Sequence, residues 1–347
     1  MKFSVLFIFL SLLLVESFAE ADVMLAQPAD DSQYYITWND LTLSSGSRFR
    51  LRDGGANDRK RVIVVDKNGG GDSLTVQGAV DMVPENNADR VKIHILPGVY
   101  SEKVRVPASK TFISFIGDEN QASAAIITGQ DKVSNTETEN SATVVVQSDY
   151  FCAAWITFQN SAVGAQAVAL RISGDKSVFY EARFLGSQDT LLDEYGTHYF
   201  FRCFIQGTVD FIFGFARSLY KESTISVLPG SNAIAAHGRG SANDNTGYSF
   251  VNCTVTGNGP VYLGRAWGDY SRVIYSYSEF DVDIYPEGWS DFGYTTKDNK
   301  VVFGEYKCRG RGANRSGRVS YSKELSDSEA KTYLDESFIN GELWLRI

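Results

Sequence analysis

The chain has 347 residues, of which 43% are hydrophobic and 22% are charged, and its formal net charge is -9. An acidic surface disfavours nucleic acid as a partner and nonspecific adhesion to anionic polymers, so any anionic ligand must be held locally. The four cysteines include no C-x-x-C pair and are too few for a disulfide scaffold, and the three histidines lack metal-ligand spacing. We therefore expect no structural metal site.

The N-terminus has the pattern of a secretory signal peptide. Lys2 precedes an apolar run over residues 3–15, and small residues follow. The run is too short for a membrane helix, and no later segment reaches the eighteen or more apolar residues that a span needs. We predict a signal peptide over 1–19, an N-terminal extension over 20–60 and one domain over 61–347. A buried N-terminal strand fits the lysine and the later polar residues less well.

Short runs rich in Val, Ile, Phe and Tyr, bounded by Gly, Asn, Asp or Ser, predict β-strands along the rest of the chain. The clearest runs cover residues 61–65, 91–96, 143–146, 179–185 and 199–205. Two segments have a helical pattern. One covers 75–83, with an apolar face, and the other follows Ser326, where Ser326 and Glu329 form a capping box.

The strands contain a sequence repeat. Segments 181–186, 202–207 and 252–257 each place a small residue four positions before a glycine, and 221–225 and 277–280 have the same pattern without the glycine. A spacing of about twenty to thirty residues suits one coil of a parallel β-helix, in which coils stack at about 4.8 Å. The predicted fold is all-β, a single-stranded right-handed parallel β-helix with short capping helices. The helix over 75–83 would cap its N-terminal end.

This register predicts an inward-facing column of small residues. Its members are Ala182, Cys203, Ser223, Cys253 and Ser278. Cys203 and Cys253 would lie two coils apart, roughly 10 Å by the strand spacing. A disulfide needs Cα atoms within about 7 Å, so we predict that this pair is not bridged.

The same repeat aligns two aspartates. Asp189 lies three residues after Gly186, and Asp210 lies three residues after Gly207. Equivalent positions on adjacent coils would place their Cα atoms about 5 Å apart. Two carboxylates at that distance resist ionising together, so we expect one pKa to rise and the other to fall, as an acid paired with a nucleophile requires. Two solvated loop aspartates fit the spacing equally well, because turns are rich in Asp.

Five motifs surround these positions. They are GVYSE at 98–102, QAVAL at 166–170, GSQDTL at 186–191, VDFIFG at 209–214 and LGRAW at 263–267. In this order they resemble the signature of plant pectin methylesterases, from about Val62 to the C-terminus. Ala266 stands where the family usually has proline, a feature shared with its quartet-type subgroup, and Phe215 stands where the family usually has asparagine. The resemblance is to the subgroup without an inhibitor-like pro-domain.

The resemblance implies a catalytic role for each matching residue. Asp210 matches the family's nucleophile and Asp189 its acid/base. Gln166 and Gln188 match the amides that stabilise the anionic intermediate, and Arg265 matches the guanidinium that holds the nucleophile. The residue types suit this chemistry, because a carboxylate can attack an ester carbonyl while a protonated carboxyl donates to the departing methanol.

The resemblance also implies a substrate site. Trp267 matches a substrate-contacting aromatic residue, and Trp289 and Phe213 would offer further flat faces to sugar rings; taken separately, each aromatic residue also fits a core position. Arg265 and Gln166 would contribute to the same site. The implied substrate is methyl-esterified homogalacturonan in the plant cell wall, with methanol and de-esterified pectate as products.

The expected partners are this polymer and a proteinaceous pectinesterase inhibitor, with no nucleic acid, no membrane, no cofactor and a monomeric state. The protein would be secreted, and Asn252 and Asn314 begin glycosylation acceptor patterns. Two alternatives stay open. One is a catalytically weak or silent pectin-binding homologue, which Phe215 permits. The other is a different β-helix pectin enzyme, a polygalacturonase or lyase, although neither explains the paired glutamines.

Overall fold

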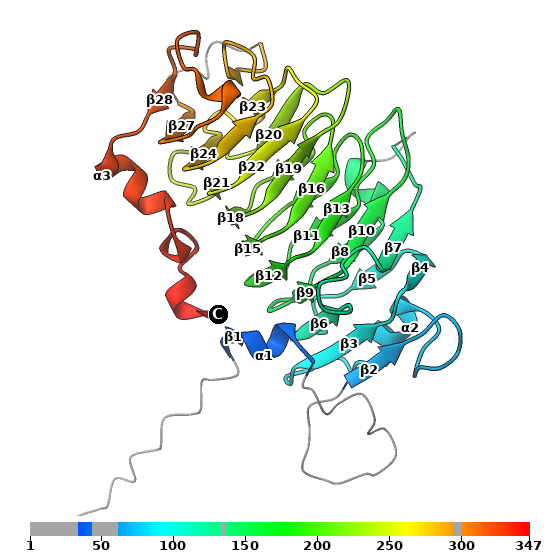
Figure 1. The fold of residues 1–347 in the computed structure, drawn as a ribbon. Coiled ribbons are helices and arrows are strands. Elements are labelled where there is room, and N and C mark those ends of the chain that lie inside the picture. Colours follow the sequence, from blue (N-terminus) through cyan, green and yellow to red (C-terminus); the bar gives the residue numbers. More distant parts are fainter. Residues whose placement is uncertain (1–33, 44–61, 134–136, 294–299) are drawn as a thin grey trace, which may run out of the picture. The chain divides into compact units, whose positions relative to one another are not determined.

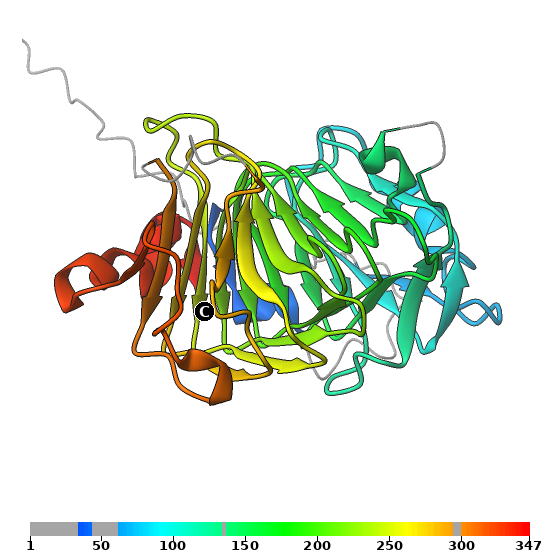
Figure 2. The same cartoon turned by 90° about the horizontal axis from the view of Figure 1, so that it is seen from above.

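The computed structural model describes residues 34–43, 62–133, 137–293 and 300–347. The predicted signal peptide and most of the N-terminal extension lie outside these residues. From β3 to β27 of the described part, parallel strands stack in sheets whose neighbours lie three strands apart in sequence, so each full coil adds one strand to each of three sheets (Figure 1). Figure 2 shows the coils stacked one upon another. The predicted parallel β-helix is confirmed.

Three of the four sheets in the described residues form the coils, and we name them the large sheet, the cleft sheet and the third sheet; the fourth has only two strands. The large sheet has the order β2 (Val62–Val65), β3 (Val91–Ile95), β6 (Ile113–Ile116), β9 (Cys152–Ala154), β12 (Ser177–Tyr180), β15 (Thr197–Phe201), β18 (Arg217–Lys221), β21 (Gly247–Val251), β24 (Arg272–Ser276), β27 (Val302–Tyr306) and β28 (Ser322–Glu324). The cleft sheet has the order β5 (Val104–Val106), β8 (Val144–Val146), β11 (Leu170–Ile172), β14 (Leu191–Asp193), β17 (Ile212–Gly214), β20 (Ala233–His237), β23 (Tyr262–Ala266) and β26 (Trp289–Ser290). The third sheet has the order β4 (Gly98–Ser101), β7 (Ala125–Gly129), β10 (Thr157–Asn160), β13 (Arg183–Leu185), β16 (Phe204–Gly207), β19 (Thr224–Val227), β22 (Thr254–Gly257) and β25 (Glu279–Asp281).

Two runs predicted as single strands each form two strands. Run 179–185 divides into β12 and β13, and run 199–205 divides into β15 and β16. At each break one residue has left-handed backbone, Glu181 with φ 46° and Arg202 with φ 55°. A single left-handed residue turns the chain from the large sheet into the third sheet, and its side-chain type does not reveal that conformation. The prediction of continuous strands was therefore wrong at these corners.

The predicted column of small residues follows these corners inside the coils. Its five members, Ala182, Cys203, Ser223, Cys253 and Ser278, are all buried. The Oγ atom of Ser223 accepts a hydrogen bond from the Cys203 N–H at 3.0 Å, and Ser278 does the same for Cys253 at 3.1 Å. Pairing of β16 with β19 and of β19 with β22 puts the two cysteines two coils apart. Both thiols are free, as predicted.

Aromatic side chains from the large sheet form a second buried column. Phe179, Phe200, Tyr220, Phe250 and Tyr275 stack ring on ring, with successive centroids 4.5–4.7 Å apart. This distance matches the spacing of neighbouring strands, so each coil contributes one ring in register. The stack fixes how successive coils align.

The predicted helix over 75–83 forms as α2 (Val76–Asp81) and packs on the first coils. Thr75 caps it by accepting the Gly78 N–H at 3.0 Å. The carboxylate of Glu102, the last residue of the first motif, accepts the N–H groups of Val76 and Gln77, each at 2.9 Å. The first motif therefore holds the N-terminal cap.

The predicted capping box at Ser326 also forms and begins α3 (Asp327–Ala330). The chain then passes through three short 3-10 helices and returns along the large sheet, where the Lys221 ammonium pairs with Glu336 at 2.9 Å. It ends with β29 (Leu345–Arg346) paired to β1 (Ile36–Thr37). The remaining helices are α1 (Trp38–Leu41), η3 (Thr138–Ser141), η5 (Arg311–Ala313), η6 (Lys331–Tyr333), η7 (Glu336–Ile339) and η8 (Gly341–Leu343). Across the described ranges, none of these helices has the length and hydropathy of a membrane span.

Candidate active site

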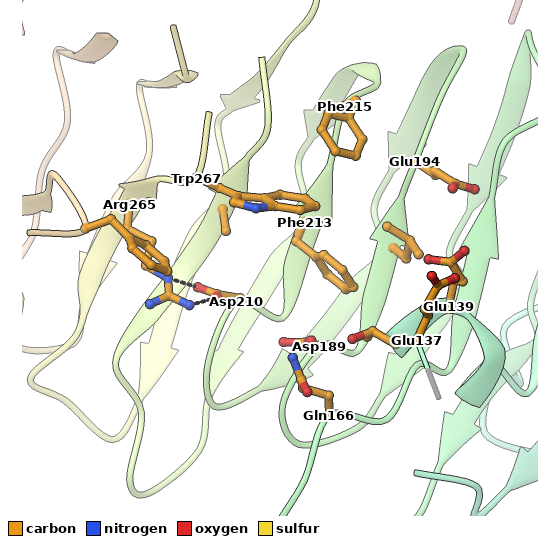
Figure 3. A pocket seen from close by; sticks show the side chains of 14 residues that line it. Glu137, Glu139, Gln166, Asp189, Glu194, Asp210, Phe213, Phe215, Arg265 and Trp267 are labelled. Atoms are coloured by element: carbon orange, nitrogen blue, oxygen red, sulfur yellow. Dashed lines mark hydrogen bonds and ion pairs between the residues drawn. The ribbon is translucent and has the colours of Figure 1, made fainter. Parts of the chain in front are cut away.

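A cleft of about 520 Å³ lies over the cleft sheet (Figure 3). Its lining combines carboxylates, aromatic rings and one guanidinium. The residues are Glu137, Thr138, Glu139, Gln166, Asp189, Leu192, Glu194, Asp210, Phe213, Phe215, Ala236, Arg265, Trp267 and Phe292. The cleft thus contains most of the residues that the motifs predict for a catalytic site.

Asp189 and Asp210 occupy equivalent positions on adjacent coils, because β14 and β17 pair in register just after them. Both have left-handed backbone, with φ 65° and 48°. The Asp189 N–H donates to the Val209 carbonyl at 3.0 Å, which joins the two turns. A Cβ atom at Gly207 would lie 2.2 Å from that of Phe211, so this turn requires glycine. The backbone therefore brings the two carboxylates together.

Arg265 on β23 holds the second carboxylate in a two-point contact. Its Nε donates to Asp210 Oδ1 at 2.6 Å, and its Nη2 donates to Oδ2. The guanidinium also lies over the Phe292 ring, 4.1 Å from the centroid. A bidentate contact fixes the plane of the Asp210 carboxylate as well as its position.

Burial changes the acidity of the first carboxylate strongly. Asp189 is only 4% exposed. Burial and the neighbouring Asp210 charge raise the pKa of Asp189 to about 7, against opposing contributions from Gln166, Arg265 and Gln188. A carboxyl with this pKa is a proton donor and acceptor near neutral pH.

The pKa of Asp210 also lies above its ordinary value, because burial outweighs the hydrogen bonds and charge of Arg265. The expectation that one pKa falls was therefore wrong. Asp210 is 7% exposed, and a single cation does not fully replace the water that burial removes. The shift at Asp189 is the larger of the two, so the pair remains asymmetric.

The two glutamines, Gln166 and Gln188, both interact with the side chain of Asp189. Gln166 lines the cleft, and Gln188 lies next to it through an isolated parallel bridge between the two residues. Their side-chain amides hydrogen-bond to the Asp189 carboxylate, which favours its ionised form. Figure 3 shows Gln166 beside Asp189. Two uncharged N–H donors therefore lie beside the aspartate pair.

The three predicted sugar-binding aromatic residues differ in position. Trp267, 41% exposed, and Phe213 line the cleft with ring centroids 6.1 Å apart. Trp289 is 1% exposed and stacks on Phe303 in the core, with centroids 4.6 Å apart. A buried indole presents no face to a substrate, so the assignment of Trp289 to the substrate site was wrong. Its ring packs beneath Gly264, where a Cβ atom would lie 3.2 Å away.

Several lining residues were missed by the sequence reasoning, above all Glu137, Glu139 and Glu194. The coil repeat contained a signal for one of them. Glu194 and Phe215 lie five residues after the two aspartates, so in-register pairing of β14 and β17 places them side by side above the pair. Glu137 and Glu139 come from η3 and its preceding residue, where no repeat guides a prediction.

The arrangement suits covalent catalysis at a carbonyl. An oriented carboxylate adjoins a carboxyl that can be protonated near neutral pH, and amide donors lie beside them. Among the residues that the structure describes, no group of three or more His, Cys, Asp or Glu side chains is arranged to hold a metal ion. The parallel β-helix thus presents an oriented carboxylate, a buried carboxyl group and aromatic rings in one cleft.

Comparison with known proteins identifies the family. The sequence model described as Pectinesterase matches residues 62–342, and the chain therefore belongs to the pectinesterase family. It is 52% identical to Pectinesterase QRT1 of Arabidopsis thaliana, covering 90% of each chain. It is 39% identical to Pectinesterase 1 of Olea europaea, covering 84% of this chain and 81% of the relative.

Solved structures agree with this assignment. The pectin methylesterase from carrot is 36% identical, with a TM-score of 0.77, over 84% of this chain and 96% of that one. A pectin methylesterase from Aspergillus niger is 30% identical, with a TM-score of 0.71, over 84% and 97%. The fold predicted from the repeat and the family and reaction class predicted from the motifs are confirmed: the chain is a carboxylic ester hydrolase of the pectinesterase type.

Proposed function

We propose that this protein hydrolyses the methyl esters of homogalacturonan with Asp210 as nucleophile and Asp189 as acid and then base. The observation that carries the proposal is the bidentate contact of Arg265 with Asp210, made beside a buried carboxyl whose pKa is about 7. Arg265 keeps the nucleophile oriented and favours its ionised form, while Asp189 can be protonated at neutral pH. The two aspartates therefore differ as their roles require.

The reaction follows in two steps. An oxygen of Asp210 bonds to the ester carbonyl carbon, and the tetrahedral oxyanion accepts hydrogen bonds from the amides of Gln166 and Gln188. The bond from carbon to the methoxy oxygen breaks, and Asp189 gives its proton to the departing methanol. Water then attacks the acyl-enzyme while Asp189 takes its proton, which releases Asp210 and a galacturonate carboxyl.

The substrate site extends along the cleft from this pair. Trp267 and Phe213 offer apolar ring faces to pyranose rings, and Arg265 and Gln166 lie beside the ester. Phe215 lines the same cleft, and Arg265 contacts Asp210 in its presence. No observation in the cleft favours the catalytically silent alternative.

The cellular setting remains part of the proposal. We infer secretion through residues 1–19, an extension over 20–60, a catalytic domain over 61–347 and action in the plant cell wall. Asn252 and Asn314 are exposed, as attachment of a glycan requires. A proteinaceous inhibitor as partner and a monomeric state stay predictions.

The test is Asp210→Asn with highly methylated pectin as substrate. We expect methanol release to fall by about 10³-fold or more, because the amide cannot attack the ester. Asp281→Asn, an exposed site on the third sheet, is the matched control and should keep wild-type activity. Circular dichroism checks that both variants fold.

Substantial methanol release by folded Asp210→Asn would remove Asp210 from the nucleophile role. The polymer also distinguishes the reaction class. An esterase does not cut the pectin chain, so the viscosity of the solution does not fall through chain cleavage. A polygalacturonase or lyase cuts the chain and lowers the viscosity.

A further inference from the structure

The loop that carries Gln166 is longer than the corresponding turn of the next coil. Residues 161–169 separate β10 from β11, whereas residues 186–190 separate β13 from β14. The pairing of β10 with β13 places Asn160, the last residue of β10, where Gly186 stands on the next coil. A polar side chain therefore begins the longer loop at a position where the shorter turn has glycine.

Side-chain packing does not hold the tip of this loop. Val163 is 70% exposed. Gly164 has left-handed backbone with φ 77°, and apart from its chain neighbours a Cβ atom built there would meet no atom of the described residues within 4 Å. Backbone with so few contacts opens readily unless hydrogen bonds fix its ends. The bonds at the two ends of the loop therefore decide where Gln166 lies.

Asn160 joins both ends of the loop through one side chain. Its Oδ1 accepts the Ala162 N–H at 3.1 Å, and its Nδ2 donates to the Val168 carbonyl at 3.1 Å. The same Nδ2 also donates to the carbonyls of Asp131 at 2.9 Å and Ser141 at 3.2 Å. An amide nitrogen has two hydrogens, so the three carbonyls share them. Asn160 is only 2% exposed, so these bonds are shielded from water.

The segments that Asn160 contacts also bind the loop directly. The Val133 N–H donates to the Gln166 carbonyl at 3.0 Å. The Oγ atom of Ser141 accepts the Val168 N–H at 3.1 Å. These bonds fix the backbone at and after Gln166, and Figure 3 shows the side chain of Gln166 beside Asp189.

We propose that Asn160 is a positioning residue for the reaction, because its side chain holds the loop that presents the Gln166 amide to the reacting groups. This role rests on the proposed function of Gln166 as a donor to the tetrahedral oxyanion. Such a donor is effective only when it is in place before the reaction, and a displacement of about 1 Å can cost about 10²-fold in rate. Asn160 does not line the cleft, so it acts through the loop.

A double-mutant cycle in methanol release from highly methylated pectin tests this role. Gln166→Ala should lower kcat by about 10²-fold, the cost of losing one oxyanion donor. Asn160→Ala should lower kcat by about tenfold with little change in KM, because an interaction of the transition state is weakened. In the Gln166→Ala background, Asn160→Ala should change kcat by less than about twofold. An equal loss in both backgrounds, or an unchanged kcat in folded Asn160→Ala, would overturn the proposal.

A milder variant keeps the test valid if Asn160→Ala does not fold. Ser141→Ala removes the acceptor of the Val168 N–H and leaves Asn160 in place. It should lower kcat by about threefold, and only while Gln166 is present. If Asn160→Ala does not fold, an unchanged kcat in Ser141→Ala contradicts the proposal.

Asn87→Ala is the matched control, because it removes an asparagine amide of the same kind far from the cleft. Asn87 lies between α2 and β3, and its Nδ2 donates to the carbonyls of Asp89 at 2.6 Å and Thr111 at 2.7 Å. The control should keep the kcat and KM of the wild type even where its melting temperature falls. A loss of kcat equal to that of Asn160→Ala would indicate a general effect of lost stability and would count against the positioning role.

A measurement without turnover separates this role from the proposed function. Crystal structures of the wild type and of Asn160→Ala should show the Gln166 amide displaced from Asp189 in the variant, with Gln188 unmoved. A Gln166 amide that stays in place contradicts the positioning role. If Gln166→Ala keeps wild-type methanol release, the proposed function of Gln166 fails instead, whereas its displacement in the crystal still supports the hold of Asn160 on the loop.

Discussion

Two corners of the β-helix use the same backbone device for different purposes. At the corner between the large sheet and the third sheet, left-handed residues such as Glu181 and Arg202 turn the chain, and the next residue enters the core. At the corner beside the cleft, the left-handed residues are Asp189 and Asp210, and these are themselves buried. A left-handed turn alone therefore does not create a reactive group. The two corners differ because Asp189 and Asp210 are buried, whereas Glu181 and Arg202 are not.

Each corner also has an arginine–carboxylate pair. Arg202 Nε lies 3.1 Å from Glu222 with half of the arginine side chain exposed, so water screens this contact. Arg265 binds Asp210 at two points in a cleft that shields the carboxylate. The same residue types thus give a weak surface contact at one corner and an oriented carboxylate, the proposed nucleophile, at the other.

The largest effect should come from Asp189→Asn, which removes the titrating group of the cleft corner. Methanol release should fall by about 10²- to 10⁴-fold, because the proton donor is lost. The free energy of unfolding should change in the other direction, because the variant should gain stability relative to the wild type as pH rises. The folded pKa of about 7 lies above the ordinary value of 3.8, so between these pH values the unfolded chain loses a proton that the folded chain retains.

Wild-type stability from this group therefore falls as pH rises from about 4 to 7, by about 1.4 kcal/mol for each unit of pKa difference. The variant has no carboxyl at this position and lacks this loss. The free energy of unfolding of the variant minus that of the wild type should therefore increase from about pH 4 to about pH 7. Urea unfolding at pH 4, 5.5, 7 and 8 measures the difference. A difference that stays flat with pH would show that Asp189 is not a buried carboxyl of raised pKa.

An intermediate effect should come from Cys203→Leu at the other corner. The longer side chain must enter a column of small residues between Ala182 and Ser223, and overpacking of this kind costs about 1–3 kcal/mol. Thermal unfolding measures the loss, with Cys203→Ala as the control for removing the thiol. If Cys203→Leu melted at the wild-type temperature, the column would not be tightly packed.

The smallest effect should come from Arg202→Gln, which breaks the exposed pair with Glu222. The free energy of unfolding should change by at most about 0.5 kcal/mol, and high salt should reduce the change further. Denaturant titration at two salt concentrations measures it. A loss of several kcal/mol would mean that the two arginine pairs are energetically alike, which contradicts the contrast between the corners.

Local sequence determined the coil and the alignment of Asp189 with Asp210. Strand runs, the glycines after small residues and the spacing of Asp189 and Asp210 depend on neighbours within one or two coils, and stacking at a fixed distance carries that register through the chain. The column through Cys203 and Cys253 could be predicted in this way. The motifs around Asp210 and Arg265 are also short local segments, and they were sufficient to identify the family.

Tertiary structure alone decided which residues around the cleft are exposed and how their charges combine. Trp289 entered the core and Trp267 the cleft, although both are tryptophans near the same sheet, because exposure depends on what the next coils place above each ring. The raised pKa of Asp210 and the presence of Glu137 and Glu194 in one cleft likewise depend on segments far apart in sequence. Desolvation and electrostatic potential are sums over all neighbours in space, so no local pattern of residues could supply them.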